Sequence, residues 1–230
     1  MSEDTSPVSE IIVHGIVVGA FQENCWVVGN RRTGEAICID PGDEPEEILA
    51  MARDMGVRIR YIANSHAHID HILGVRRIRE ETGARFLLHR GDLELARSTA
   101  AQARAWMGVE IEDPPEPDAL IADLDEIDVD GLKVQVLHTP GHTRGSVCFY
   151  ANGVVFAGDT LFQGSIGRTD LPGGDQDEEM ASIVERLLVL PDETIVLPGH
   201  MGQTTIGQER QRNPFVRMEL ERRAGTERDG

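Results

Sequence analysis

The sequence predicts a single domain of the α+β class, on the basis of two observations. The chain has 230 residues, of which 40% are hydrophobic, which is enough to fill one large core without disulfide bonds. Runs that alternate or are β-branched are interspersed with runs whose apolar positions recur every three to four residues, and no linker separates them. Residues 1–230 are therefore predicted to form one domain, with flexible ends at about residues 1–9 and 222–230.

The first half of the chain is predicted to begin with strands and to continue with helices. Three alternating or β-branched runs with polar turns between them are expected to be strands: 11–18, 24–29 and 35–39. Pro45 stands in the first turn of a predicted helix, where no N–H is needed. Residues 58–64 alternate like a strand, and the apolar positions from Ile72 onward have helical spacing. Residues 92–107 are Ala-rich and predict a helix, which the Pro-rich segment 113–118 ends in an exposed loop.

The second half of the chain is predicted to contain further strands followed by helices. Alternating or continuous apolar runs predict strands at 132–137, 146–150, 153–157 and 194–197. Asn152-Gly153 predicts a tight hairpin turn between the middle two. A helix is expected over 178–189, and a short helix that frays is expected from Asn213 onward.

The segment His66-Ala67-His68-Ile69-Asp70-His71 holds four potential metal ligands within six residues. It lies between a predicted strand and a predicted helix, and loops on a rigid scaffold are common places for chemistry. Imidazole nitrogen suits zinc, iron or nickel, and a carboxylate adds a harder ligand. Residues two apart in extended backbone point the same way, so His66 and His68 can share one ion while Asp70 and His71 reach a second. Three of the eight histidines of the chain are in this segment, which argues against four merely solvated loop residues.

Three more segments repeat the arrangement of a strand followed by a potential ligand beside a glycine. The candidate ligands are His142, Asp159 and His200, each just past the end of a predicted strand. Glycine beside them lets the backbone approach closely. Together with the six-residue segment, they predict one metal centre assembled from several strand ends.

These residues and their order resemble the metallo-β-lactamase superfamily, and Asp40-Pro41-Gly42 after an N-terminal strand matches it too. The resemblance spans about residues 11–214 and implies a four-layer αββα sandwich with metals at one edge between two sheets. It also implies two divalent metal ions, with zinc expected and iron or manganese as alternatives. By this resemblance the first ion is held by His66, His68 and His142. The second is held by Asp70, His71 and His200, and Asp159 bridges both ions.

Within the superfamily, the chain is most similar to glyoxalase II and its short bacterial relatives. The similar segments are 22–25, 157–175, 204–207 and 213–215. The resemblance implies hydrolysis of S-acylglutathione-type thioesters by a metal-bridging hydroxide, which Asp70 would orient as the catalytic residue. It implies that Arg168 binds the substrate. Two departures weaken the case for glutathione: only about thirty residues follow His200, too few for the helical domain of full-length glyoxalase II, and Gly202 stands where the family has tyrosine.

Four alternatives remain for the function. A mononuclear iron persulfide dioxygenase keeps the histidine segment and a Gly-Arg-Thr-Asp stretch, so Arg168 does not distinguish it. A lactonase of this fold is disfavoured because Tyr61 and Tyr150 are the only tyrosines. A true two-zinc β-lactamase usually has cysteine where Asp159 stands. A metal-stabilised scaffold without catalysis is disfavoured by the full ligand set, since a structural zinc site is closed by four ligands.

Composition excludes several classes of partner. The formal net charge of −18 argues against nucleic acid, since phosphate contacts need a basic face, and Lys133 is the only lysine. No apolar run is long enough to span a bilayer, and the acidic segment 1–7 lacks the features of a secretory signal, so a cytoplasmic protein is predicted. The expected partner is a small-molecule thioester substrate, and nothing in the sequence indicates an oligomeric state. The three cysteines are expected to be reduced and buried: Cys25, Cys38 and Cys148.

Overall fold

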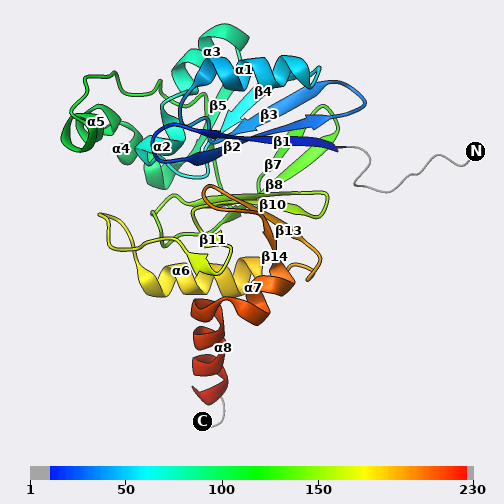
Figure 1. The fold of residues 1–230 in the computed structure, drawn as a ribbon, viewed down its shortest axis with the longest axis vertical. Helices are drawn as coiled ribbons and strands as arrows, with labels where there is room; N and C mark the ends of the chain where they lie inside the picture. The colour runs from blue at the N-terminus through cyan, green and yellow to red at the C-terminus, as the bar shows by residue number, and fades with distance from the viewer. Residues whose placement is uncertain (1–10, 227–230) are drawn as a thin grey trace, which may run out of the picture.

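The computed structural model describes residues 11–226 and contains two six-stranded sheets that face each other (Figure 1). Helices cover the outer face of each sheet, so the order of layers is helix, sheet, sheet, helix. This is the predicted αββα sandwich. Residues 1–9 and 227–230, which were predicted to be flexible, lie outside the described residues.

The first sheet contains the N-terminal half of the chain. Its strands lie in chain order, antiparallel from β1 to β3 and parallel from β3 to β6. They are β1 (Ile11–Val18), β2 (Glu23–Asn30), β3 (Glu35–Ile39), β4 (Arg58–Ala63), β5 (Arg85–His89) and β6 (Ala119–Ile121). The crossover helices α1 (Pro45–Asp54) and α3 (Val75–Thr82) cover its outer face, as parallel strands require.

The second sheet contains the C-terminal half. Its order is β14 (Thr204–Thr205), β13 (Ile195–Pro198), β10 (Val154–Gly158), β9 (Val147–Ala151), β8 (Leu132–His138) and β7 (Glu126–Val129). A small ribbon of β11 (Leu161–Phe162) and β12 (Ser165–Ile166) follows β10. The outer helices are α6 (Gln176–Ser182), which continues as a π-helix over Ile183–Leu187, α7 (Ile206–Arg212) and α8 (Pro214–Thr226). Residues 222–226, predicted to be flexible, form the end of α8.

Three apolar layers hold the sandwich together. The layer between the sheets includes Ile37 and Ile39 of the first sheet and Phe149 and Phe156 of the second. Cys38, between the two isoleucines, points to the other face and packs in the layer under α1 and α3. A third layer packs the second sheet against α6 and α8. Strands buried on both faces therefore read as continuous apolar runs.

Two predicted helices differ from the structure. The helix expected over 92–107 is divided into α4 (Leu93–Ala96) and α5 (Thr99–Met107). The division follows from Ser98 and Thr99, whose hydroxyls donate to the carbonyls of the preceding turn and end α4. The helix expected from Ile72 begins instead at α3, because the Gly74 N–H donates to the Pro41 carbonyl (2.8 Å) and interrupts the helix.

The cysteines behave as predicted: Cys25, Cys38 and Cys148 are buried and form no disulfide. Between residues 11 and 226, no helix combines the length and apolar character that a membrane span needs. The Pro-rich segment 113–118 is a loop, as expected, although much of it is only partly exposed.

Candidate metal centre

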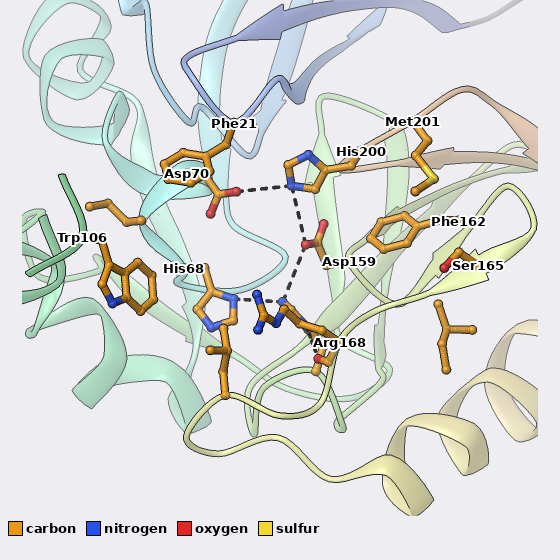
Figure 2. A pocket seen from close by; sticks show the side chains of 14 residues that line it. Phe21, His68, Asp70, Trp106, Asp159, Phe162, Ser165, Arg168, His200 and Met201 are labelled. Atoms are coloured by element: carbon orange, nitrogen blue, oxygen red, sulfur yellow. Dashed lines mark hydrogen bonds and ion pairs between the residues drawn. The ribbon is translucent and has the colours of Figure 1, made fainter. Parts of the chain in front are cut away.

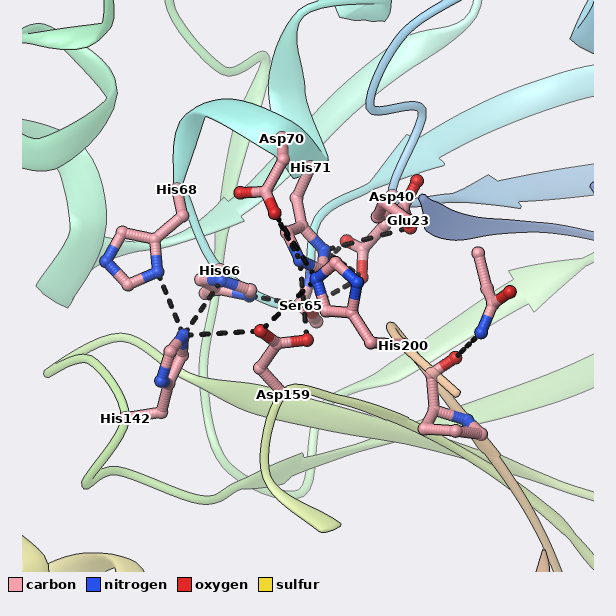
Figure 3. Close-up of polar contacts among 12 residues, drawn as sticks. Glu23, Asp40, Ser65, His66, His68, Asp70, His71, His142, Asp159 and His200 are labelled. Carbon is pink, nitrogen blue, oxygen red and sulfur yellow. Dashed lines mark hydrogen bonds and ion pairs between the residues drawn. The ribbon is translucent and has the colours of Figure 1, made fainter. Parts of the chain in front are cut away.

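A cleft of about 690 Å³ opens at one edge of the sandwich, where strands of both sheets end (Figure 2). Its floor brings together the seven predicted metal ligands (Figure 3). His66 and His68 follow β4, and His142, Asp159 and His200 follow β8, β10 and β13. The two remaining ligands, Asp70 and His71, lie in the short helix α2 (Ile69–Ile72) rather than on the loop that was predicted for them.

Three of the ligands form what we call the three-histidine cluster: His66, His68 and His142. His68 Nδ1 lies 2.9 Å from His142 Nε2, which lies 3.2 Å from His66 Nε2. Donor atoms around a tetrahedral zinc ion, each at its usual bond length, lie about 3.3 Å apart. The three nitrogens therefore have the mutual spacing of ligands to one ion.

The other four ligands form what we call the mixed cluster: Asp70, His71, Asp159 and His200. His200 Nε2 lies 3.2 Å from Asp70 Oδ2 and 3.6 Å from Asp159 Oδ2. Asp159 Oδ1 lies 3.4 Å from His71 Nε2, and its Oδ2 lies 3.6 Å from His142 Nε2. Asp159 thus stands between the two clusters, where a bridging ligand was predicted.

Hydrogen bonds at the outer nitrogens aim the imidazole lone pairs at the centre. His142 Nδ1 donates to the carbonyl of Arg168 (2.7 Å), which leaves Nε2 as the inward lone pair. The Ser65 hydroxyl donates to Asp40 Oδ2 (2.6 Å), so its oxygen accepts from His66 Nδ1 (3.0 Å) and His66 Nε2 also faces inward unprotonated. Metal-ligating histidines in proteins are held by such outer partners.

Two buried carboxylates lie behind His71. Its Nδ1 is 3.2 Å from Asp40 Oδ2 and 3.8 Å from Glu23 Oε1. Asp40 also accepts from the backbone N–H of Ser65 (2.6 Å), which ties β3 to the loop after β4. Burial raises the pKa of Glu23 well above its usual value, and the carboxyl group nearer to His71 Nδ1 is that of Asp40.

Electrostatics differ between the two clusters. Burial and the neighbouring histidines lower the pKa of His66 and His68, for His68 to about 3, so both are neutral. Burial on its own raises the pKa of Asp70 and Asp159, but the combined effect of His71 and the other neighbouring histidines outweighs it and keeps both below their usual values. Burial likewise lowers the pKa of His71, but Asp159 and Asp70 raise it well above its usual value. Burial lowers the pKa of His200 too, but Asp70 and Asp159 raise it above its usual value, so the two carboxylates favour positive charge beside them, whether protons or a cation supply it.

Sequence analysis did not identify Asp92, which joins the two loops of the three-histidine cluster. Its buried carboxylate accepts from the N–H of Ala67 (3.0 Å), the N–H of Gly145 (2.8 Å) and the hydroxyl of Thr143 (2.8 Å). Asp92 comes after β5 and directly behind a glycine, as Asp159 comes after β10 and directly behind Gly158, so the pattern of a glycine and a carboxylate near a strand end was a signal for this residue.

Glu179 is a second residue that sequence analysis missed. It is fully buried on α6, and its Oε2 accepts from the backbone N–H of His142 (2.7 Å). A Cβ at Gly141 would lie 2.2 Å from the Glu179 backbone, so only glycine allows the His142 loop to pack this closely on α6. No local pattern around Glu179 predicts this role.

Glycine beside the ligands has the predicted effect at Gly199. A Cβ there would lie 2.5 Å from Asp159 Oδ1 and 2.6 Å from His71 Cε1. A side chain at this position would displace two ligands of the mixed cluster. The cluster can therefore form only because glycine lets the backbone come this close.

Arg168 lines the cleft, as a substrate-binding residue must. Its guanidinium is 61% exposed and pairs with Asp170 through two hydrogen bonds of 2.8 Å each. Its backbone carbonyl also holds His142, so Arg168 positions a predicted ligand whatever its side chain binds.

The fold and the converging ligands define a metal-binding protein of the αββα class. The chain belongs to the metallo-β-lactamase superfamily, whose family model matches residues 18–200. It is 37% identical over 205 residues to hydroxyacylglutathione hydrolase GloC of Haemophilus influenzae, covering 87% of this chain and 96% of that protein.

Two solved structures resemble the chain over nearly its whole length. The crystal structure of BLEG-1 B3 metallo-β-lactamase has a TM-score of 0.84 at 36% identity and covers 89% of this chain and 99% of that one. The structure of TTHA1623 in a di-iron-bound form has a TM-score of 0.79 at 42% identity and covers 88% and 99%. These similarities agree with a metal centre, and the di-iron form of TTHA1623 shows that a related centre of this fold holds iron.

Proposed function

We propose that this protein is a metal-dependent thioester hydrolase with two divalent ions in its centre. The observation that carries the proposal is the pair of ligand clusters, which share Asp159 at the floor of an open cleft. The similarity to a hydroxyacylglutathione hydrolase supports a thioester as the substrate. We propose zinc as the metal, and iron or manganese as substitutes, because the ligands combine imidazole with carboxylate.

The chain supplies the positions of the reacting groups. When bound, two divalent ions polarise an acyl carbonyl and lower the pKa of a shared water to near neutrality. Asp70 lines the cleft and lies 3.2 Å from His200, so its carboxylate can accept a hydrogen bond from the attacking water and orient it. A thiolate leaves readily, so the reaction does not require a dedicated general acid, and the cleft lining contains no lysine or tyrosine.

The test combines metal analysis with a thioester-hydrolysis assay on untagged protein. We expect about two ions per chain and metal-dependent hydrolysis of S-lactoylglutathione and of a short neutral thioester. Asp70→Asn should lower kcat about a hundredfold while thermal stability falls only modestly, because the amide fills the same space without the charge. Asp54→Asn, an exposed change at the end of α1, is the matched control and should leave kcat unchanged.

Other outcomes identify the competing functions. One iron per chain with oxygen consumption on glutathione persulfide would establish the dioxygenase instead. Since the chain resembles a B3 metallo-β-lactamase, hydrolysis of a β-lactam without hydrolysis of any thioester would also overturn the proposal. Hydrolysis of lactones alone would do the same.

A further inference from the structure

We propose that the cleft selects thioesters with an extended apolar acyl group. This inference rests on the proposed function and specifies its substrate class. The cleft has the volume of a small-molecule site, and half of the residues that line it are apolar. They include Phe21, Ile69, Trp106, Phe162, Leu171 and Met201.

Three of these side chains are exposed although they are large and apolar. Phe21, in the turn between β1 and β2, is 47% exposed, Trp106 on α5 is 53% exposed, and Met201 after β13 is 59% exposed. They come from three segments far apart in the sequence and meet around one opening (Figure 2). An apolar rim of this kind around a polar floor is typical of a ligand site rather than of scattered surface residues.

The backbone holds Met201 at this rim. Its φ of +68° is in the left-handed region, which is uncommon for methionine, and its carbonyl accepts from Asn24 Nδ2 (3.0 Å). Asn24 also donates through its backbone N–H to Gly199 (2.7 Å). The first sheet therefore fixes the segment that carries both His200 and Met201, and the exposed methionine is a built feature of the cleft.

The charge of the cleft disfavours an anionic occupant. Among residues 11–226, Arg168 is the only Lys or Arg in the lining, and Asp170 already binds its guanidinium through two hydrogen bonds. The chain as a whole has a formal charge of −18. The glutathione tail has two carboxylates, which would meet a single cationic side chain that is already paired with Asp170. An apolar group needs no cationic partner.

Apolar side chains flank the ligands on both sides. In Figure 2, Trp106 lies beside His68 at one end, and Phe162 and Met201 lie beside His200 at the other. The Phe162 ring is 6.2 Å from the His200 ring between centroids. An acyl chain that extends from the metal centre in either direction therefore meets an apolar wall.

The experiment measures hydrolysis of thioesters of N-acetylcysteamine, a thiol without the carboxylates of glutathione. Their acyl chains range from acetyl to octanoyl. Burial of each added methylene should raise kcat/KM roughly two- to fourfold until the cleft is filled. Trp106→Ala and Phe21→Ala should flatten this dependence, because they should lower kcat/KM for the octanoyl thioester more than for the acetyl thioester. Val189→Ala, at a 71% exposed apolar residue outside the lining, is the control and should leave the dependence unchanged.

A binding measurement separates the cleft from the chemistry. Non-hydrolysable S-alkyl thioethers of N-acetylcysteamine should shift the emission of Trp106, with affinity that rises with chain length. The only other tryptophan, Trp26, is partly buried and donates to the Pro198 carbonyl (3.1 Å), and Trp106→Phe should abolish the shift.

The outcomes are distinct. Thioester hydrolysis that is independent of acyl length, or that falls with it, overturns the apolar specificity and leaves the hydrolase proposal standing. Length-dependent thioether binding without hydrolysis of any thioester overturns the hydrolase and supports an apolar cleft. Absence of both overturns both.

Discussion

The three-histidine cluster and the mixed cluster differ in charge and in access to solvent. His66, His68 and His142 are buried imidazoles, held by outer hydrogen bonds and by the Asp92 carboxylate. In the mixed cluster, Asp70 and His200 are partly exposed, and two carboxylates stand beside the two imidazoles. One ion position is therefore rigid, shielded and rich in nitrogen, and the other is open, charged and rich in oxygen.

This difference indicates separate roles for the two positions. Three shielded nitrogen ligands favour zinc and slow exchange of the bound ion. Carboxylate ligands also bind harder ions such as manganese. The open position borders the apolar rim of Phe21 and Met201, so a substrate in the cleft would meet this position most directly. The predictions below test whether the clusters are separable and what maintains each.

The largest effect is expected from Asp159→Asn, because Asp159 is the one residue between the clusters. Loss of its charge should reduce metal content at both positions and lower kcat/KM about a thousandfold or more. His200→Asn, which changes only the mixed cluster, should leave about one ion per chain. Elemental analysis with hydrolysis assays checks both, and equal metal loss in the two variants would mean that the clusters are not separable.

An intermediate effect is expected from Asp92→Asn, which acts on the three-histidine cluster alone. The side-chain amide group of asparagine places its own N–H groups opposite hydrogen-bond donors, from which the carboxylate had accepted. The free energy of unfolding should therefore fall by about 1–3 kcal/mol. Metal affinity should fall roughly tenfold or more through the loosened His66 and His142 loops.

Asp118→Asn is the matched control for this prediction, because Asp118 also accepts from a backbone N–H, that of Phe86 (2.8 Å), but away from the clusters. It should cost stability without changing metal affinity, as measured by denaturant unfolding and zinc competition. If Asp92→Asn lost stability and kept its zinc affinity, the carboxylate would support the fold and not the cluster.

The smallest effect concerns a pair of histidines outside both clusters. His89 and His138 stack with ring centroids 4.3 Å apart, and burial and His138 lower the pKa of His89 to about 4. The unfolded chain has the ordinary value near 6.5, so it binds more protons than the folded protein between the two values. This stabilising contribution is complete above about pH 6.5 and is lost as the pH falls toward 4.

His89→Asn should therefore weaken the loss of stability on acidification, while its amide oxygen still accepts from the Gly91 N–H. Denaturant unfolding of the metal-free protein at several pH values measures the difference. His14→Asn, at an exposed histidine of β1, should follow the wild-type pH dependence. An unchanged slope in His89→Asn would show that the stacked pair does not contribute.

Local sequence determined the predicted ligands and most of the elements that carry them. Each ligand follows a strand whose alternation or β-branched content is visible in a few residues, and four ligands are nearly consecutive from His66 to His71. The bounds of β1 and β3 and the start of α1 agree with prediction for the same reason, since strand pattern and an N-terminal proline are local properties. The αββα order came from the family resemblance, because periodicity alone specifies only a mixed class.

Tertiary structure alone decided what holds the ligands and what surrounds the substrate. Asp92 and Glu179 bond backbone N–H groups that lie 25 to 53 residues away in the chain, and no short pattern encodes a partner at that distance. The break before α3 depends on Pro41, which reaches Gly74 only in the folded protein. Phe21, Trp106 and Met201 are each unremarkable in the sequence and form a rim only because three segments converge on one opening. Periodicity reports which face of an element is apolar, whereas contacts between distant segments depend on how the two sheets pack.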